Sequence, residues 1–301
     1  MQKITIKIPN CEHLVEWLRF IVNNRNSDRS NAGRLFIFDF RQISFLFPYH
    51  LTSLACLIEE YRLSGARIRI LYREGTDSGN FIKYSKFDQY WTSNSNRNYC
   101  LKARLTNTMP IWKHKVENID AFAGVIQNFY AAHSLKEKDL TPLRLTVVEA
   151  LNNITDHSES KVSGFIATQF YKQKSELCIS ICDFGKGIPN KVNEFIGDVK
   201  GRLDDSQALQ KALELGFSTK SNPHNRGFGL DIILTIVKAN KGEITIVSNR
   251  AFYSKQIQSV NVKSELDNLA FSFPGTYLVI KLNTSHFQLL EAESSEEVEL
   301  F

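Results

Sequence analysis

The first third of the chain alternates between strand-like and helix-like spacing of its apolar residues. A period of two over residues 3–9 predicts a strand, and an apolar stripe over residues 11–24 predicts an amphipathic helix. The same spacings predict strands over 34–40 and 66–72, a helix over 48–65, and a short helix over 84–91. Strands that alternate with helices indicate an α/β layer architecture with some parallel strand pairs.

From residue 118 onward the pattern changes, because two long helices come before the next strands. An apolar stripe covers residues 118–133, and Thr141-Pro142 starts a second helix, since threonine caps helices and proline favours their first position. Apolar runs then predict strands over 162–172, 176–184, 243–249 and 275–282, and helices over 191–196, 206–215 and 230–240.

The change of pattern predicts two domains without a long linker. We place their boundary between residues 94 and 118, and take it at 108. The chain is then divided into domains over 1–108 and 109–285, followed by an acidic tail over 286–301.

Composition excludes several classes of protein. Of the 301 residues, 43% are hydrophobic and 23% are charged, as in globular domains. The formal net charge of +5 is small and scattered, so it does not indicate nucleic acid as a partner. No apolar run is long enough to span a bilayer, the N-terminus lacks a signal-peptide pattern, and the five cysteines form no CxxC pair. We therefore expect a cytoplasmic protein with reduced thiols.

Glu149 and Asn153 stand four residues apart on the helix predicted from Thr141, so they share one face. An asparagine oxygen can ligate Mg²⁺, and a glutamate can accept a proton from an attacking nucleophile. His157 continues the same face one turn later. Taken alone, a solvated polar helix face is the better explanation of the pair.

Asp183 ends an apolar strand and is followed by Gly185 and Gly187. A carboxylate at a strand end can accept a hydrogen bond from an exocyclic amine such as that of adenine, and glycines let the backbone approach a ligand closely. The alternative is an ordinary turn closed by an Asx-type hydrogen bond.

Gly227 and Gly229 precede the helix predicted over 230–240, whose first N–H groups form a ready anion site. Lys220 and Arg226 lie just upstream, in a loop long enough to move. The alternative is a flexible loop that ends in a glycine turn. Neither a Walker motif nor GxGxxG is present here, which excludes P-loop and Rossmann sites.

The order and spacing of these motifs are much more specific than any one of them. The series VVEALNNITDH, CDFGKGIP, GFSTK, NRGFGL and GTYLVIKL resembles the ATP-binding domain shared by gyrase, chaperone, histidine-kinase and MutL proteins, the GHKL family, over residues 118–282. The resemblance implies an α/β sandwich (Bergerat fold), in which helices cover one face of a mixed sheet.

The resemblance also implies the roles of individual residues. It places these residues at ATP: Asp183, Gly185, Gly187, Lys220, Arg226, Gly227, Phe228, Gly229, Leu230 and Thr276. Asp183 would hold the adenine, Lys220 would belong to a lid, Asn153 would bind Mg²⁺, and Glu149 would act as a base.

Within the family, VEALNNITDH looks most similar to the anti-sigma-factor serine kinases, and residues 34–71 resemble STAS, the small α/β domain that those kinases phosphorylate. STAS domains carry an acceptor serine at the start of the helix, where this chain has Pro48 and Tyr49. The nearest hydroxyls belong to Ser44, Thr52 and Ser53. We therefore expect a docking or regulatory domain and not a fused substrate.

Two functions remain open from the sequence. The first is an ATP-dependent conformational switch in signalling or regulation, with slow hydrolysis or none, in which Glu149 activates water. The alternative is an anti-sigma-type serine/threonine kinase that acts on a partner protein. Both need ATP, Mg²⁺ and a protein partner, and relatives often form homodimers. A histidine kinase is disfavoured because the segment around His133 has the wrong spacing for a phosphoacceptor box.

Overall fold

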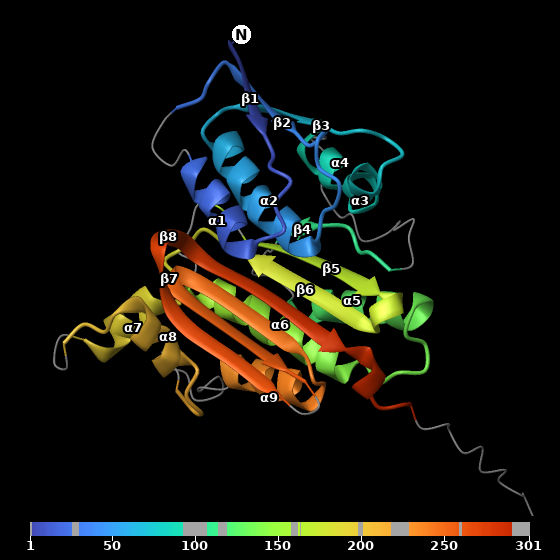
Figure 1. Cartoon of the computed structure of the whole chain (residues 1–301), viewed down its shortest axis with the longest axis vertical. Coiled ribbons are helices and arrows are strands. Elements are labelled where there is room, and N and C mark those ends of the chain that lie inside the picture. The colour runs from blue at the N-terminus through green and yellow to red at the C-terminus, as the bar shows by residue number, and fades with distance from the viewer. Residues whose placement is uncertain are drawn as a thin grey trace, which may run out of the picture.

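The computed structural model describes residues 2–25, 30–92, 107–113, 119–157, 162, 164–197, 201–217, 229–258 and 261–290. Two β-sheets and the helices packed on them form four layers, in the order sheet, helices, sheet, helices (Figure 1). In the described part of the chain, no helix combines the length and the apolar character that a membrane span needs.

The N-terminal unit contains a three-stranded sheet in the order β1-β2-β3. Its strands pair in parallel, as the alternation of strands and helices predicted. Its elements are β1 (Gln2–Lys7), α1 (Leu14–Asn23), β2 (Arg34–Asp39), α2 (Pro48–Leu63), β3 (Arg67–Leu71), α3 (Asp77–Tyr84) and α4 (Phe87–Thr92). Sequence reasoning missed α3, because its residues are mostly polar. The helix starts where the Thr76 hydroxyl accepts a hydrogen bond from the Gly79 N–H (3.1 Å).

The second unit is a five-stranded sheet in the order β4-β5-β6-β8-β7. Its elements are β4 (Trp112–Lys113), α5 (Ile119–His133), α6 (Thr141–His157), β5 (Phe165–Tyr171), β6 (Glu176–Cys182), α7 (Ile188–Ile196), α8 (Asp205–Ala212), α9 (Gly229–Ala239), β7 (Glu243–Ile257) and β8 (Val262–Asn283). The sequence predicted a mixed sheet, but every pairing among the described strands of this sheet is antiparallel.

Strands β7 and β8 are much longer than their apolar runs predicted. The second half of β7 folds back beside its first half, so that the Ile257 N–H donates to the carbonyl of Gly242 (2.9 Å). Asn249, at a positive φ of 53°, lies where the register of the β7–β8 pair shifts. The added hairpin is mostly exposed along β8, so no burial pattern marked it in the sequence.

Helix α2 lies between the two sheets and joins the two units. Thirteen of its sixteen residues are buried. The Thr52 hydroxyl lies 2.8 Å from that of Ser180 on β6, and the Tyr277 hydroxyl donates to the carbonyl of Tyr49 (3.0 Å). One hydrophobic core extends from β2 through α2 to β6 and β8. Helices α5, α6 and α9 cover one face of the five-stranded sheet, as expected, and α1 and α2 cover the other.

A buried ion cluster links the same two units. Glu59 on α2 is completely buried, and its carboxylate binds the Arg62 guanidinium (2.7 Å) and the Lys113 ammonium on β4 (2.6 Å). Burial alone would raise the pKa of Glu59, but the hydrogen bonds from these two cations lower it below the ordinary value of 4.5. Glu59 therefore stays charged inside the interface.

Candidate functional site

Asp183 lies just beyond the C-terminal end of β6 and is 1% exposed. Its two carboxylate oxygens accept hydrogen bonds from the N–H groups of Gly185 (2.7 Å) and Thr276 (3.2 Å). Burial raises the pKa of Asp183 to about 7, and the two N–H donors only partly offset this rise. The bond from Gly185 is the Asx-type hydrogen bond that an ordinary turn would have. The bond from Thr276 comes from a distant strand, and no cation among the described residues lowers the pKa of the buried carboxyl, so burial and the raised pKa are what mark Asp183 as a candidate binding group.

The backbone around Asp183 leaves no room for side chains. A Cβ on Gly275, which has a φ of +72°, would lie 2.3 Å from the Gly185 nitrogen and 2.4 Å from the Asp183 carbonyl oxygen. A Cβ on Gly187 would lie 2.1 Å from the Asn249 Oδ1. Both positions therefore require glycine.

Sequence reasoning missed two residues that hold this loop. One is Gly275, which the sequence offered only as a glycine-threonine pair at a strand start. The other is Ser248, whose hydroxyl accepts from the Ile188 N–H (2.8 Å) and donates to the Gly275 carbonyl (2.8 Å). Ser248, within β7, thus ties the start of α7, which follows the loop after β6, to Gly275 within β8, and no local pattern could reveal that.

Asn153 and Gly229 meet where α6 touches α9. A Cβ on Gly229 would lie 2.7 Å from the Asn153 Oδ1. The Asn153 Nδ2 is buried and has no hydrogen-bond partner in the described part of the chain. Glu149, half-buried, lies one helical turn before Asn153 on α6. A buried amide with unused capacity is expected where a ligand completes the bonding.

A small cavity lies beside Asn153. Its volume is about 10 Å³, and its lining consists of Ala150, Asn153, Ile188, Leu230, Ile246, Thr276 and Leu278. Three of the predicted residues, Asn153, Leu230 and Thr276, thus come together from α6, α9 and β8. The cavity has room for one water at most. A nucleotide base could enter only if the first turn of α9 moved away from α6.

Four predicted residues, Lys220, Arg226, Gly227 and Phe228, lie outside the described residues, as do the hydroxyls of Ser218 and Thr219. Their positions near ATP remain predictions. Among the described residues, Thr276 links the two parts of the candidate site, because its N–H binds Asp183 and it lines the cavity with Asn153 and Leu230. Gly229 lies against Asn153, and Gly187 lies against Asn249.

The N-terminal unit contacts the peptide on both sides of Asp183. On one side, the Cys56 thiol of α2 donates to the carbonyl of Cys182 (3.2 Å). On the other side, the Arg25 guanidinium lies over the ring of Phe184, 4.9 Å from its centre, and pairs with Glu60 (2.6 Å). These contacts were not predicted, because the residues involved are far apart in the sequence.

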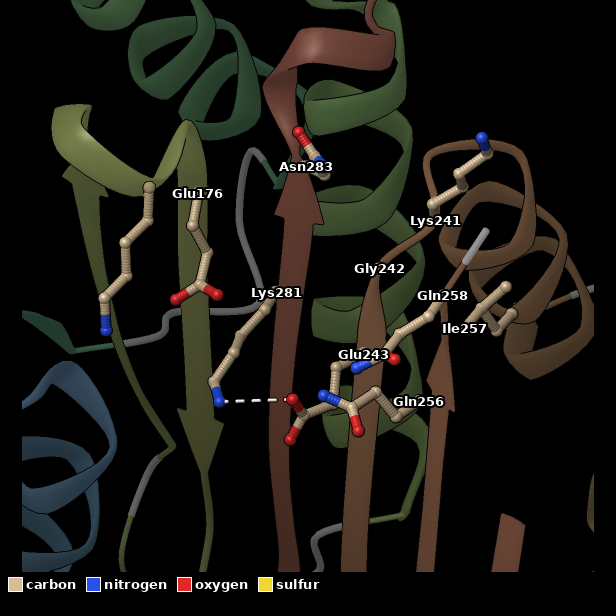
Figure 2. A pocket seen from close by; sticks show the side chains of 10 residues that line it. Glu176, Lys241, Gly242, Glu243, Gln256, Ile257, Gln258, Lys281 and Asn283 are labelled. Carbon is tan, nitrogen blue, oxygen red and sulfur yellow. Dashed lines mark hydrogen bonds and ion pairs between the residues drawn. The ribbon is translucent and has the colours of Figure 1, made fainter. Parts of the chain in front are cut away.

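A second, polar groove lies at the opposite end of the five-stranded sheet (Figure 2). Its volume is about 120 Å³, and inside it the Lys281 ammonium binds the Glu243 carboxylate (3.3 Å). Glu176, at the start of β6, also lines it, whereas Asp183 follows the end of that strand. None of the predicted site residues lines this groove, and no group of metal-ligating side chains occurs among the described residues.

Comparison with known proteins supports the family resemblance for part of the chain. Residues 113–244 match the family model of the histidine kinase-like ATPase domain. This range contains Glu149, Asn153, Asp183 and Leu230, and it supports ATP binding by this region. No curated protein matches the chain.

Two solved structures are similar to the chain at low identity. One is the 43K ATPase domain of Thermus thermophilus gyrase B in complex with an aminocoumarin, with 15% identity over 60% of this chain and 44% of that chain, and a TM-score of 0.28. The other is the topoisomerase IV ATP-binding domain of Francisella tularensis in complex with a small-molecule inhibitor, with 14% identity over 61% and 45%, and a TM-score of 0.28. The chain covers less than half the length of each of these two structures. With a TM-score of 0.28, the similarity supports no conclusion about this chain.

Proposed function

From the histidine kinase-like ATPase domain over residues 113–244, we propose that the chain is an ATP-dependent conformational switch. One observation carries this proposal. The N-terminal unit contacts the residues before and after Asp183, the group that would hold the adenine. A change in the position of Asp183 on nucleotide binding would therefore reach α1 and α2 directly.

The residues at the site fit a nucleotide. The Asp183 carboxylate would accept a hydrogen bond from the exocyclic amine of adenine, and the missing Cβ of Gly275 lets the backbone lie close to it. The Asn153 amide, with its buried unpaired nitrogen, would offer its oxygen to Mg²⁺. The ion would supply charge to offset the phosphates. Glu149, one turn away, would orient or deprotonate a water molecule.

Entry of the base would drive the switch. The cavity that Asn153 and Leu230 line is only about 10 Å³, so we propose that binding of the base separates Leu230 from Asn153. The segment before Gly229 contains Lys220, Arg226, Gly227 and Phe228, which we propose as the lid over the phosphates. A ligand that binds only the open arrangement shifts the population toward it by its difference in affinity.

The kinase alternative loses its most direct substrate. Thr52 and Ser53 on α2 are both 0% exposed, and Thr52 contacts Ser180 inside the core. Neither hydroxyl can reach a phosphate unless the two units separate. Ser44 is exposed, but its hydroxyl is bound to Asn10 (2.9 Å). In this arrangement Thr52 and Ser53 cannot accept phosphate, and Ser44 would first have to break its bond to Asn10.

Hydrogen exchange followed by mass spectrometry, with and without ATP and Mg²⁺, tests the switch. We expect changed protection in residues 182–187 and also in α1 and α2. Arg25→Gln should reduce the response of α1 and α2 without abolishing ATP binding. Arg19→Gln is the matched control, because Arg19 lies on α1, shortly before Arg25, and its guanidinium is over Phe271 (5.6 Å) instead of Phe184. If ATP binds by calorimetry while α1 and α2 exchange as before, the chain is not this switch. Phosphate transfer to a partner protein without such a response would favour the kinase.

A further inference from the structure

The outer face of the β1–β3 sheet is uncovered in the described part of the chain. Helices α1 to α4 lie on the other side of this sheet (Figure 1). Ile4, Phe36 and Ile68 point toward those helices and belong to the core or pack against it. Leu35 and Ile37 alternate with the core residues of β2 and are half-buried, yet neither belongs to a hydrophobic core of the described residues.

The strand register places basic side chains around these aliphatic ones. Lys3, Leu35 and Arg67 lie side by side across the sheet, and so do Thr5, Ile37 and Arg69, and then Lys7, Asp39 and Leu71. Lys3, Lys7, Arg67 and Arg69 are exposed, and none forms an ion pair with another described residue. Asp39 is bound by Arg41 (2.7 Å). We call these nine residues of β1 to β3 the outer face.

Two kinds of occupant do not suit the outer face. Proteins that bind single-stranded nucleic acid on a sheet stack bases on aromatic side chains, and none of the nine residues is aromatic. Face-to-face pairing of two copies would set four cations against four others, which is repulsive. An extended segment that combines acidic and apolar residues would satisfy both the cations and the aliphatic strip.

The chain itself contains such a segment at residues 291–301, EAESSEEVELF. It carries five glutamates and no basic residue, and Val298, Leu300 and Phe301 supply apolar side chains. We infer that the outer face binds the acidic segment 291–301 of a second copy of the chain. The binding is between copies because the last described residues, after the turn at Thr284–His286, lie at the end of the molecule away from β1–β3 (Figure 1).

This contact has a defined symmetry and strength. The outer face of one copy meets the acidic segment of the next, so the interface is heterologous and can continue from copy to copy. Each exposed charge pair contributes little and is screened by salt. The association should therefore be weak, dependent on protein concentration, and strongest at low ionic strength.

Sedimentation velocity on the full chain tests this inference. Wild-type protein should associate with rising concentration at low salt and dissociate at high salt. Deleting residues 291–301, or the double change Lys3→Glu and Arg69→Glu, should weaken association by at least about tenfold. The control double change Lys172→Glu and Lys263→Glu alters the net charge equally at exposed positions elsewhere and should leave association unchanged.

Mixing the two defective proteins separates this contact from others. The deleted chain still has an intact outer face, and the charge-reversed chain still has its acidic segment. Their mixture should therefore form a one-to-one complex, although neither associates alone. A labelled peptide of residues 287–301 should bind the deleted chain and not its charge-reversed form. The inference is overturned if the mixture stays monomeric, or if the peptide binds both forms equally.

Discussion

Replacing Asp183 by asparagine should make the ligand-free protein more stable at pH 8 and at the same time weaken ATP binding. Folding raises the pKa of Asp183 from its ordinary value of 3.8 to about 7, because the carboxyl is buried. The native state thus favours the neutral acid. Its contribution to stability is most favourable below pH 3.8 and is lost as the pH rises to 7. At pH 8 the ionised carboxylate costs about 4 kcal/mol, at about 1.4 kcal/mol per pH unit between the two pKa values.

The amide has a cost of its own. In the wild type the carboxylate accepts hydrogen bonds from the N–H groups of Gly185 and Thr276. The NH₂ group of asparagine would face one of these N–H groups and leave it without an acceptor. An unsatisfied buried donor costs about 1–3 kcal/mol. That cost does not depend on pH, whereas the cost of ionisation falls to about 1.6 kcal/mol at pH 5. The stability of Asp183→Asn relative to wild type should therefore rise by about 2–3 kcal/mol from pH 5 to pH 8.

Urea unfolding, followed by tryptophan fluorescence between pH 5 and pH 8, measures this difference. Asp267→Asn, which removes an exposed carboxylate, is the matched control and should change stability little. Calorimetry on the same proteins should show ATP affinity reduced by tenfold to hundredfold, or about 1.4–3 kcal/mol, for Asp183→Asn. If the free energies of unfolding of variant and wild type changed in parallel between pH 5 and pH 8, burial would not raise the pKa of Asp183. Unchanged ATP affinity would refute the adenine role.

Three further changes test other parts of the molecule. Asn153→Ala should remove the Mg²⁺ dependence of ATP binding, measured by calorimetry with and without the ion; a dependence that persists would contradict the ligand role. Gly275→Ala should lower the free energy of unfolding by about 2–4 kcal/mol, because the new Cβ would lie 2.3 Å from the Gly185 nitrogen. Glu59→Gln should cost about 1–3 kcal/mol at pH 7 and progressively less below pH 4.5, where the lowered pKa of Glu59 makes its stabilisation disappear. A loss that stays constant from pH 7 to pH 3 would show that the cluster with Lys113 is not stabilising.

Much of the site was predictable because its residues are tied to local patterns. The four-residue spacing of Glu149 and Asn153 fixes one helix face, and Asp183 follows directly on an apolar strand. Helix α2 was also predicted from its first residue, Pro48, to its end near Gly65, because proline and glycine mark these positions locally. Such signals act within a few residues of each other, so a single sequence carries them.

The partners of Asp183 could not be predicted in the same way. Thr276 and Gly275 lie more than ninety residues from Asp183, and Cys56 and Arg25 lie farther still. Only strand pairing and the packing of α2 bring them together. The sequence did carry one sign that α2 is buried between two layers. The helix is apolar around most of its circumference, as in a helix that is buried on both sides.

The sequence by itself determined the order of most helices and strands, the polar groups at their ends, and the chemistry that those groups can perform. The tertiary structure decided which surface covers which. It placed α2 between two sheets and set the Arg25 side chain over Phe184. It also left Leu35 and Ile37 among cations that form no ion pair with another described residue. The physical reason is that hydrophobic spacing states that a face must be buried, but the free energy of burial is non-directional and does not name the partner.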